Sequence, residues 1–288
     1  MSYSSSSLSR VRWIFQSCIT LAMLVGLLVS NSSRASEPEL VFGIVPQQSV
    51  TELARVWIPL IQEVATRSGI RLTFRTAPDI PTFEERLKQG EYDLAYMNPY
   101  HYTVFSKEPG YRAFAKEKDR RLIGIVVVAK NSPLKDIRQL AGKIVAFPAP
   151  AAFAASILPR AEFSRLDIPI ETRYVASHDS VYRGVAQGAF AAGGGIKRTL
   201  EAIDPAVSSQ LKVLTTTPSY VPHAFAAHPR VTSETLSKVF AGLSSLDGDD
   251  TGRNLLRPLS LKGIEAASNR DWDEIRRLKI DQSVGRLP

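Results

Sequence analysis

Residues 146–160 read AFPAPAAFAASILPR, and the rest of the chain is arranged around the turn that they encode. The run at 143–147 predicts a short buried strand, and the small residues after the prolines predict the opening of a helix. In an α/β sheet, such a turn presents free backbone N–H groups at the positive end of a helix, where an anion or a polar ligand head can be held. Every side chain from 149 to 155 is apolar, so main-chain and apolar contacts would hold that ligand. A tight packing corner between helix and strand explains the same pattern equally well.

Short apolar strands alternate with amphipathic helices along the remaining sequence. Strands are expected at 40–45, 71–76, 92–97, 122–129, 144–147, 172–175, 211–215 and 223–228. Helices are expected at 50–68, 83–88, 137–140, 153–166, 181–187, 196–203, 233–245 and 271–278, with a Gly/Asp loop at 247–252. This alternation is typical of an α/β fold. It predicts two hinged lobes, with a cleft at the carboxyl ends of their strands.

The first 35 residues have the layout of a secretory signal. Arg10 and Arg12 form a short basic region, an apolar run covers 13–29, and Ser33 and Ala35 occupy the small-residue positions of a cleavage site after Ala35. An uncleaved membrane anchor is the alternative. We therefore expect an exported, periplasmic protein.

Charge and cysteine content limit the functions that the mature chain can have. Loss of Arg10, Arg12 and Arg34 with the signal lowers the formal charge from +8 to +5. No basic block with interleaved aromatic residues remains, so we expect no nucleic-acid binding. Cys18, the only cysteine, lies in the signal, so the mature protein would have no disulfide and no thiol chemistry.

The polar side chains favour binding over catalysis. His178 and Asp179 head a helix after a strand and could act as a general base with its orienting partner, or His178 could simply cap the helix. No two of the four histidines stand at i, i+4, and no cysteine accompanies them, so neither a metal nor a cofactor is expected.

Two further groups of residues could contribute to a ligand site. Tyr96, Asn98 and Tyr100 cluster at a strand end, either as a wall of the site or as a cover for the strand. A triple glycine at 193–195 allows close backbone approach. Lys197 and Arg198 after it are candidate anion partners, although a solvated helix face is the simpler interpretation.

The chain resembles the phosphate/phosphite/phosphonate-binding proteins of bacterial ABC importers. The resemblance lies in the order and spacing of 40–46 (LVFGIVP), 77–79 (APD), 92–99 (YDLAYMNP), 110–111 (GY), 126–133 (VVVAKNSP), 140–143 (LAGK), 147–160 and 177–179 (SHD). It implies a type II, Venus-flytrap periplasmic binding protein, α/β in class, with each lobe a mixed, mostly parallel sheet flanked by helices. The lobes would comprise 38–121 plus 227–280, and 122–226, with chain crossings near 120–126 and 219–226 and a tail at 281–288.

One departure from the family concerns the ligand loop. The usual Ser-Thr-Ser of that loop is replaced here by Ala152, Phe153 and Ala154, so three hydroxyl groups that would hold a phosphorus oxyanion are missing. Only His178 of the family's polar anchors is kept. The resemblance therefore leaves the ligand unassigned, and the apolar loop admits a less charged or partly apolar solute. The candidate ligand-binding residues are Gln47, Ile80, Tyr96, Asn98, Tyr100, Ala152, Phe153, Ala154, His178, Asp179 and Gly194.

Three functions follow from the resemblance and from these residues. The first is a non-enzymatic, monomeric solute-binding protein that delivers a small molecule to an ABC permease and its ATPase. The second keeps the binding fold but pairs it with a membrane sensor kinase. The third is an enzyme on the same scaffold that uses His178 and Asp179.

Overall fold

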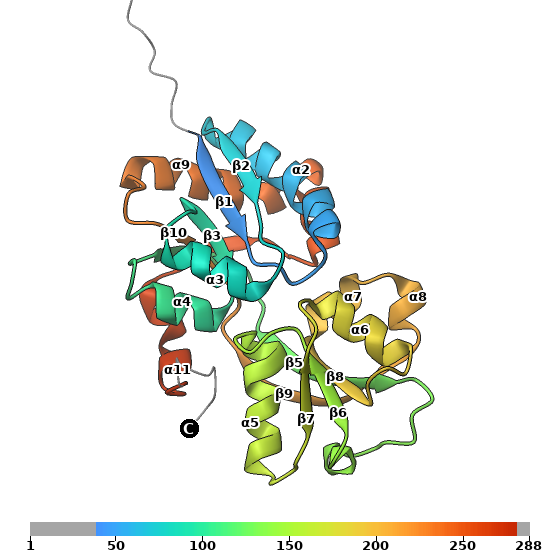
Figure 1. Cartoon of the computed structure of the whole chain (residues 1–288). Coiled ribbons are helices and arrows are strands. Elements are labelled where there is room, and N and C mark those ends of the chain that lie inside the picture. The colour runs from blue at the N-terminus through green and yellow to red at the C-terminus, as the bar shows by residue number, and fades with distance from the viewer. Residues whose placement is uncertain (1–38, 281–288) are drawn as a thin grey trace, which may run out of the picture. The chain divides into compact units, whose positions relative to one another are not determined.

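The computed structural model describes residues 39–280 (Figure 1). The predicted signal at 1–35 and the predicted tail at 281–288 lie outside the described residues. Within 39–280, no helix is both long enough and apolar enough to span a bilayer.

The first of two mixed sheets has six strands in the order β11-β4-β10-β3-β1-β2. Its strands are β1 (Leu40–Ile44), β2 (Leu72–Arg75), β3 (Leu94–Met97), β4 (Arg112–Glu117), β10 (Ala224–Ala227) and β11 (Ile264–Ala266). β1 pairs in parallel with β2 and β3, while β10 pairs antiparallel with β3 and β4, and β11 antiparallel with β4. Four of the six strands thus run in one direction, as the fold prediction requires.

The second sheet has five strands in the order β7-β6-β8-β5-β9. Its strands are β5 (Leu122–Ala129), β6 (Ile144–Phe147), β7 (Glu171–Tyr174), β8 (Ala192–Ile196) and β9 (Leu211–Tyr220). β5 runs antiparallel to both of its neighbours, and β6 runs parallel to β7 and β8. The two sheets with their flanking helices confirm the predicted type II α/β fold.

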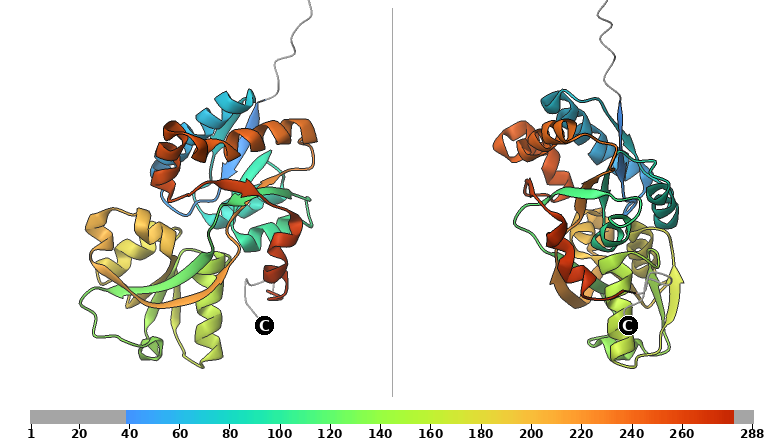
Figure 2. Two further views of the ribbon diagram at one scale, coloured as in Figure 1. Left: turned by 180° about the vertical axis from the view of Figure 1, so that it is seen from behind. Right: turned by 90° about the vertical axis from the view of Figure 1, so that its left-hand side faces the viewer.

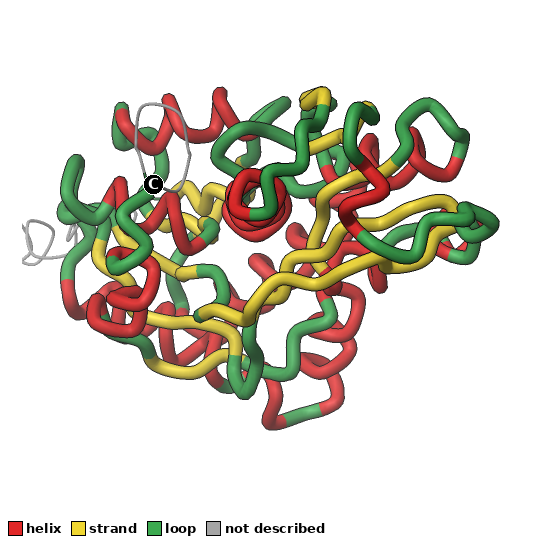
Figure 3. Tube along the Cα trace, turned by 90° about the horizontal axis from the view of Figure 1, so that it is seen from below, coloured by secondary structure: helices red, strands yellow, loops and turns green. Residues whose placement is uncertain are grey.

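Helices flank both sheets. Those associated with the first are α2 (Val50–Ser68), α3 (Ile80–Lys88), α4 (Pro99–Phe105), α9 (Ser233–Ser244), η3 (Leu246–Gly248), α10 (Asp250–Leu256), η4 (Arg257–Leu259), η5 (Asn269–Trp272) and α11 (Asp273–Arg276). Those associated with the second are η1 (Ile137–Leu140), η2 (Phe153–Ile157), α5 (Leu158–Arg165), α6 (His178–Ala186), α7 (Lys197–Ala202) and α8 (Pro205–Ser208). Seen from below, α5 lies nearly end-on beside the strands of the second sheet (Figure 3).

Two connections join the sheets, at 118–121 between β4 and β5 and at 221–223 between β9 and β10 (Figures 1 and 2). They run next to each other, since Leu122 pairs with Tyr220. β10 belongs to the first sheet, whereas the predicted lobe of 122–226 included most of it. We therefore propose to place the second lobe boundary at 221–223.

Capping explains both the successful and the failed helix predictions. α2 begins after a Ser49 cap and ends at Gly69, as the sequence pattern predicts. The φ of 70° at Gly69 is a left-handed conformation that suits glycine. The loop prediction for 247–252 was wrong, because the Asp249 side chain accepts a hydrogen bond from the Gly252 N–H and starts α10. Asn98 likewise caps α4, a helix that the sequence patterns did not predict.

The apolar loop is part of the core between the sheets. Ala149, the residues 151–155, Ile157 and Leu158 belong to the same buried cluster as the first sheet. The Phe153 ring packs edge-on against Tyr220, with ring centres 5.4 Å apart. The loop is therefore apolar because it is buried, which supports the packing-corner interpretation.

Candidate functional site

A narrow pocket between the two sheets gathers seven of the eleven candidate residues. It is lined by Val45, Gln47, Ile80, Asn98, Leu122, Ala152, Phe153, Ala154, Ala155, His178, Ile196 and His223. The free space is about 10 Å³, close to what a single water needs. A larger solute therefore requires the walls to move apart.

The helix that opens at this pocket is a π-helix, η2. Among the described residues, no acceptor is bonded to the backbone N–H groups of Phe153, Ala154 and Ala155, the first three residues of η2. They are the unpaired amides expected at a helix start. Such N–H groups attract an anion or a carbonyl oxygen.

Two glycines allow η2 to lie close to the second sheet. A Cβ on Gly124 would stand 2.1 Å from the Ala154 carbonyl oxygen, and one on Gly194 would stand 2.0 Å from the Ala155 carbonyl oxygen. Gly194 is thus placed beneath η2 and does not line the pocket. Its role here is to permit close packing.

His178 is fully buried at the start of α6. Its backbone N–H donates to the Gln47 carbonyl at 2.9 Å, so this hydrogen bond joins α6, beside the second sheet, to the loop after β1 of the first sheet. Its ring Nδ1 lies 2.9 Å from Thr199 Oγ1. Burial, and secondly the Arg198 charge, lower the pKa of His178 to about 3, so the ring is neutral at pH 7. His178 can therefore offer a hydrogen bond to a ligand but not a positive charge.

Asp179 does not orient His178. Its Oδ2 accepts a hydrogen bond from the Ser49 N–H at 3.4 Å, and its Oδ1 has no partner. Burial raises the pKa of Asp179. The His178 ring contacts Thr199 and not Asp179, so the two residues lack the hydrogen bond that a coupled base and orienting group would use.

The tyrosine wall divides between two places. Tyr96 lies beside the pocket, stacked on His223 with ring centres 5.0 Å apart, and the Arg198 guanidinium lies 5.7 Å from its ring centre. Tyr100 is buried within α4 and does not line the pocket. Asn98 uses its amide internally, because Nδ2 donates to the Ala151 carbonyl at 3.1 Å.

Arg198 and His223 are site residues that the candidate set left out. Arg198, at the start of α7, is 9% exposed and donates to Gln47 Oε1 at 2.8 Å. Gln47 Nε2 in turn lies 3.0 Å from His223 Nε2. Burial lowers the pKa of His223, and the neighbouring Arg198 lowers it further, so His223 is neutral as well. The sequence analysis named Arg198 as a candidate anion partner but favoured a solvated helix face. The structure shows instead that Arg198 is buried and bonded to Gln47, a residue far away in the chain.

The described residues give no sign of a metal centre. Among residues 39–280, no group of three or more His, Cys, Asp or Glu side chains is placed to hold a metal ion. The polar groups at the pocket are instead backbone N–H groups, neutral imidazoles, two side-chain amides and one guanidinium.

The family model of the periplasmic substrate-binding protein of phosphonate ABC transporters matches residues 42–272. The chain belongs to this family. Members of this phosphonate-binding family are substrate-binding components that serve an ABC transporter, which supports the predicted function class and a periplasmic location. No curated protein matches the sequence.

Solved structures of binding proteins share the fold at low sequence identity. A binding protein of a Pseudomonas aeruginosa ABC phosphonate transporter is 15% identical, with a TM-score of 0.79 over 85% of this chain and 86% of that one. PhnD1 of Prochlorococcus marinus, solved with methylphosphonate, is 17% identical, with a TM-score of 0.75 over 83% and 96%. A Xanthomonas citri protein bound to ATP is 15% identical, with a TM-score of 0.64 over 83% and 94%. At these identities the likeness shows the fold alone.

Proposed function

We propose that this chain captures a small phosphorus oxyanion between its two sheets and delivers it to the permease of an ABC importer. The observation that carries the proposal is the buried Arg198 guanidinium. Its hydrogen-bond partner is the neutral Gln47, and no ion pair joins it to a carboxylate among the described residues. A buried guanidinium without a salt-bridged carboxylate is costly, and an anionic solute would supply such a partner.

The unpaired N–H groups of η2 supply a second attraction for the same oxyanion. In the proposed binding mode they replace part of what the family's three hydroxyl groups provide. Arg198 contributes the charge and His178 contributes one hydrogen bond. The missing hydroxyls thus change how the anion is held without removing the means of holding it.

Residues from both sheets meet at the pocket, so a bound solute would favour their approach. Gln47 and Asn98 follow strands of the first sheet, whereas η2, His178 and Arg198 belong to the second. A ligand that contacts both sets binds better when they are close, and it shifts an open–closed equilibrium toward the closed form. Opening would also provide the space that the narrow pocket lacks.

The partners and the processing belong to the same proposal. The family assignment leads us to infer a permease and its ATPase as the recipients of the solute. Cleavage after Ala35 would release the protein into the periplasm. The mass of the exported protein checks this inference, since a chain that starts at Ser36 is expected and a chain that retains 1–35 contradicts it.

A binding assay with a matched variant tests the assignment. The chain from Ser36 is mixed with methylphosphonate, phosphate, phosphite or the neutral dimethyl sulfone, and its melting temperature is measured. At about a thousandfold Kd a ligand adds roughly 4 kcal/mol of stability, which corresponds to roughly 10 °C for a chain of this size. We expect such a shift with a phosphorus oxyanion and its loss in Arg198→Met, which keeps an unbranched side chain and removes the guanidinium. A shift with the neutral compound that survives in the variant would overturn the proposal.

A further inference from the structure

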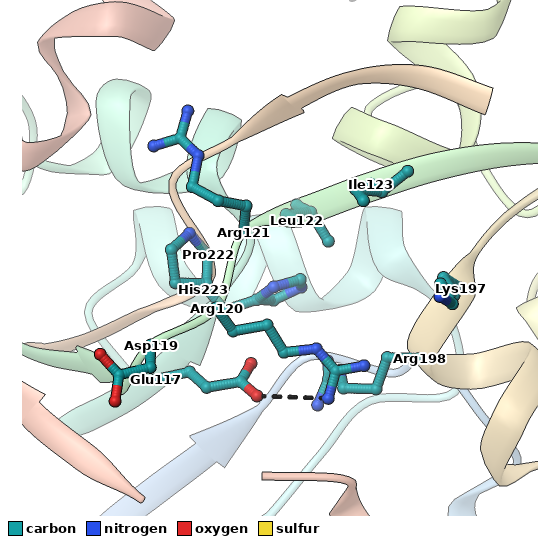
Figure 4. Close-up of a pocket in the computed structure, with 10 residues that line it drawn as sticks. All are labelled: Glu117, Asp119, Arg120, Arg121, Leu122, Ile123, Lys197, Arg198, Pro222 and His223. Atoms are coloured by element: carbon teal, nitrogen blue, oxygen red, sulfur yellow. Dashed lines mark ion pairs between the residues drawn. The ribbon is translucent and has the colours of Figure 1, made fainter. Parts of the chain in front are cut away.

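A second and larger cavity lies where the chain crosses between the sheets. This crossing cavity has a volume of about 230 Å³, against about 10 Å³ in the pocket described above. Both connections and the start of α7 contribute to its walls (Figure 4). It is lined by Glu117, Asp119, Arg120, Arg121, Leu122, Ile123, Lys197, Arg198, Pro222 and His223.

The crossing cavity adjoins the pocket. Leu122 and His223 line both spaces, and Arg198 lines the crossing cavity while it donates to Gln47 of the pocket. Leu122 and His223 therefore separate a solute held at η2 from the larger crossing cavity. Leu122 and Pro222–His223 lie at the connections, so any movement of one sheet relative to the other displaces this shared wall.

The lining of the crossing cavity carries more cations than carboxylates. Arg120 lies 3.1 Å from Glu201 and 3.5 Å from Glu117, and Lys197 lies 3.9 Å from Glu201. Arg198 pairs with no described carboxylate. Leaving aside Arg121 and Asp119, the lining thus has three cations and one carboxylate, Glu117, while Glu201 lies outside the lining.

The remaining charged residues lie at the mouth and largely offset each other. Arg121 pairs with Glu274 at 2.8 Å, and its guanidinium points away from those of Arg120 and Arg198 in Figure 4. Asp119 stands at the opposite side of the view from Lys197. Glu117 is buried and keeps one oxygen without a hydrogen bond, and burial raises its pKa although Arg198 and Arg120 lower it. The uncompensated charge in the interior is therefore positive.

Building on the proposed function, we propose that the crossing cavity binds the tail of the solute and that this tail is anionic. The ligand class is then a phosphonate whose carbon chain ends in a carboxylate. Its phosphonate group lies at η2 beside Arg198, and its carboxylate lies in the crossing cavity near Lys197 and Arg120. A cationic tail would meet Arg198 and Arg120 at close range and is disfavoured.

Isothermal titration of the chain from Ser36 with three probes tests this assignment. The probes are methylphosphonate, 3-phosphonopropionate and 3-aminopropylphosphonate, which share the head group and differ in the tail. We expect the carboxylate probe to bind about tenfold or more tighter than methylphosphonate, and the ammonium probe to bind no tighter than methylphosphonate. Equal affinities, or a preference for the ammonium probe through Glu117, would overturn the assignment.

Two variants confined to the crossing cavity locate the effect. Ile123→Phe fills space in the cavity, Lys197→Gln removes a cation that is largely exposed, and neither residue lines the pocket. Each is expected to abolish the preference for the carboxylate probe while the Kd of methylphosphonate stays within about twofold, and Ile123→Val is expected to retain the preference. A preference that survives both variants places the tail elsewhere and refutes the assignment. Methylphosphonate binding without any preference refutes the tail assignment and leaves the proposed function standing alone. Failure of all three probes also refutes the tail assignment, and failure of phosphate and phosphite as well refutes the proposed function.

Discussion

Returning one hydroxyl group to the ligand loop tests the proposed binding mode most directly. Ala154 lies in the first turn of η2, lines the pocket and is 3% exposed. The Ala154→Ser substitution adds one oxygen beside the unpaired N–H groups. The family's usual Ser-Thr-Ser loop has a serine at this position.

The same oxygen should have opposite effects on affinity and on stability. A hydrogen bond from a hydroxyl to a charged oxyanion is worth about 1.5–3 kcal/mol, which corresponds to roughly a tenfold to 150-fold lower Kd. Without a ligand, the buried hydroxyl is left short of partners, and such a group costs about 1–3 kcal/mol. The variant is therefore expected to bind methylphosphonate more tightly and to melt a few degrees lower when it is free.

Titration calorimetry measures the first effect and urea unfolding the second, with Ala149→Ser as the matched control. Ala149 is 2% exposed and belongs to the same loop, but it does not line the pocket. The control should lose stability without any gain in affinity. If Ala154→Ser leaves the Kd unchanged or raises it while the control behaves as expected, the oxyanion does not lie at η2 and the reasoning fails.

Three further predictions concern stability. Phe153→Ala removes a ring that is 1% exposed and packs on Tyr220; a loss of about 3–5 kcal/mol in urea unfolding is expected, and a loss below about 1 kcal/mol would contradict the burial of the loop. Gly194→Ala places a Cβ 2.0 Å from the Ala155 carbonyl oxygen; a loss of about 1–3 kcal/mol or more is expected in the same assay, whereas Gly188→Ala, near no other atom but at a φ of 77°, reports the backbone strain alone. Burial lowers the pKa of His178 from 6.5 to about 3, so below about pH 6.5 the unfolded chain binds more protons and stability falls by about 1.4 kcal/mol per pH unit toward pH 3. The raised pKa of Glu117 works in the opposite direction, so the measurement is the difference in slope between wild type and His178→Gln, and equal slopes would show that the buried ring does not contribute.

Local sequence was sufficient wherever one segment determines its own structure. The continuous apolar run of β5 matches its prediction at both ends, because a strand buried on both faces excludes polar residues along its whole length. The secondary-structure prediction failed where the same residue type is common both in loops and at helix caps. Asp249 lies in a stretch rich in Gly and Asp that is typical of a loop, yet the same carboxylate is a good helix cap and starts α10.

The candidate site depended on contacts that no local pattern contains. A π-helix at 153–157 requires Gly124 and Gly194, two glycines of neighbouring strands that leave room for its carbonyl groups. Arg198 follows a glycine run in a sequence that is typical of a solvated helix face. It is buried because Gln47, which lies 151 residues earlier, accepts its hydrogen bond. Such partners become neighbours only when both sheets have formed.

The two interpretations of the apolar loop are compatible, because different atoms of the same residues serve each one. The side chains of the loop pack in the core between the sheets, while the backbone N–H groups of Phe153, Ala154 and Ala155 remain unpaired at the pocket. In the proposed binding mode, a family that held its anion with hydroxyl groups on this loop has here moved the main polar contact to a guanidinium on α7. A guanidinium attracts any oxyanion through its charge, whereas three hydroxyls in fixed positions select a tetrahedral group by shape. Discrimination among phosphorus compounds would then fall to the tail, and the crossing cavity is the place where this chain has both the space and the surplus of cationic side chains to provide it.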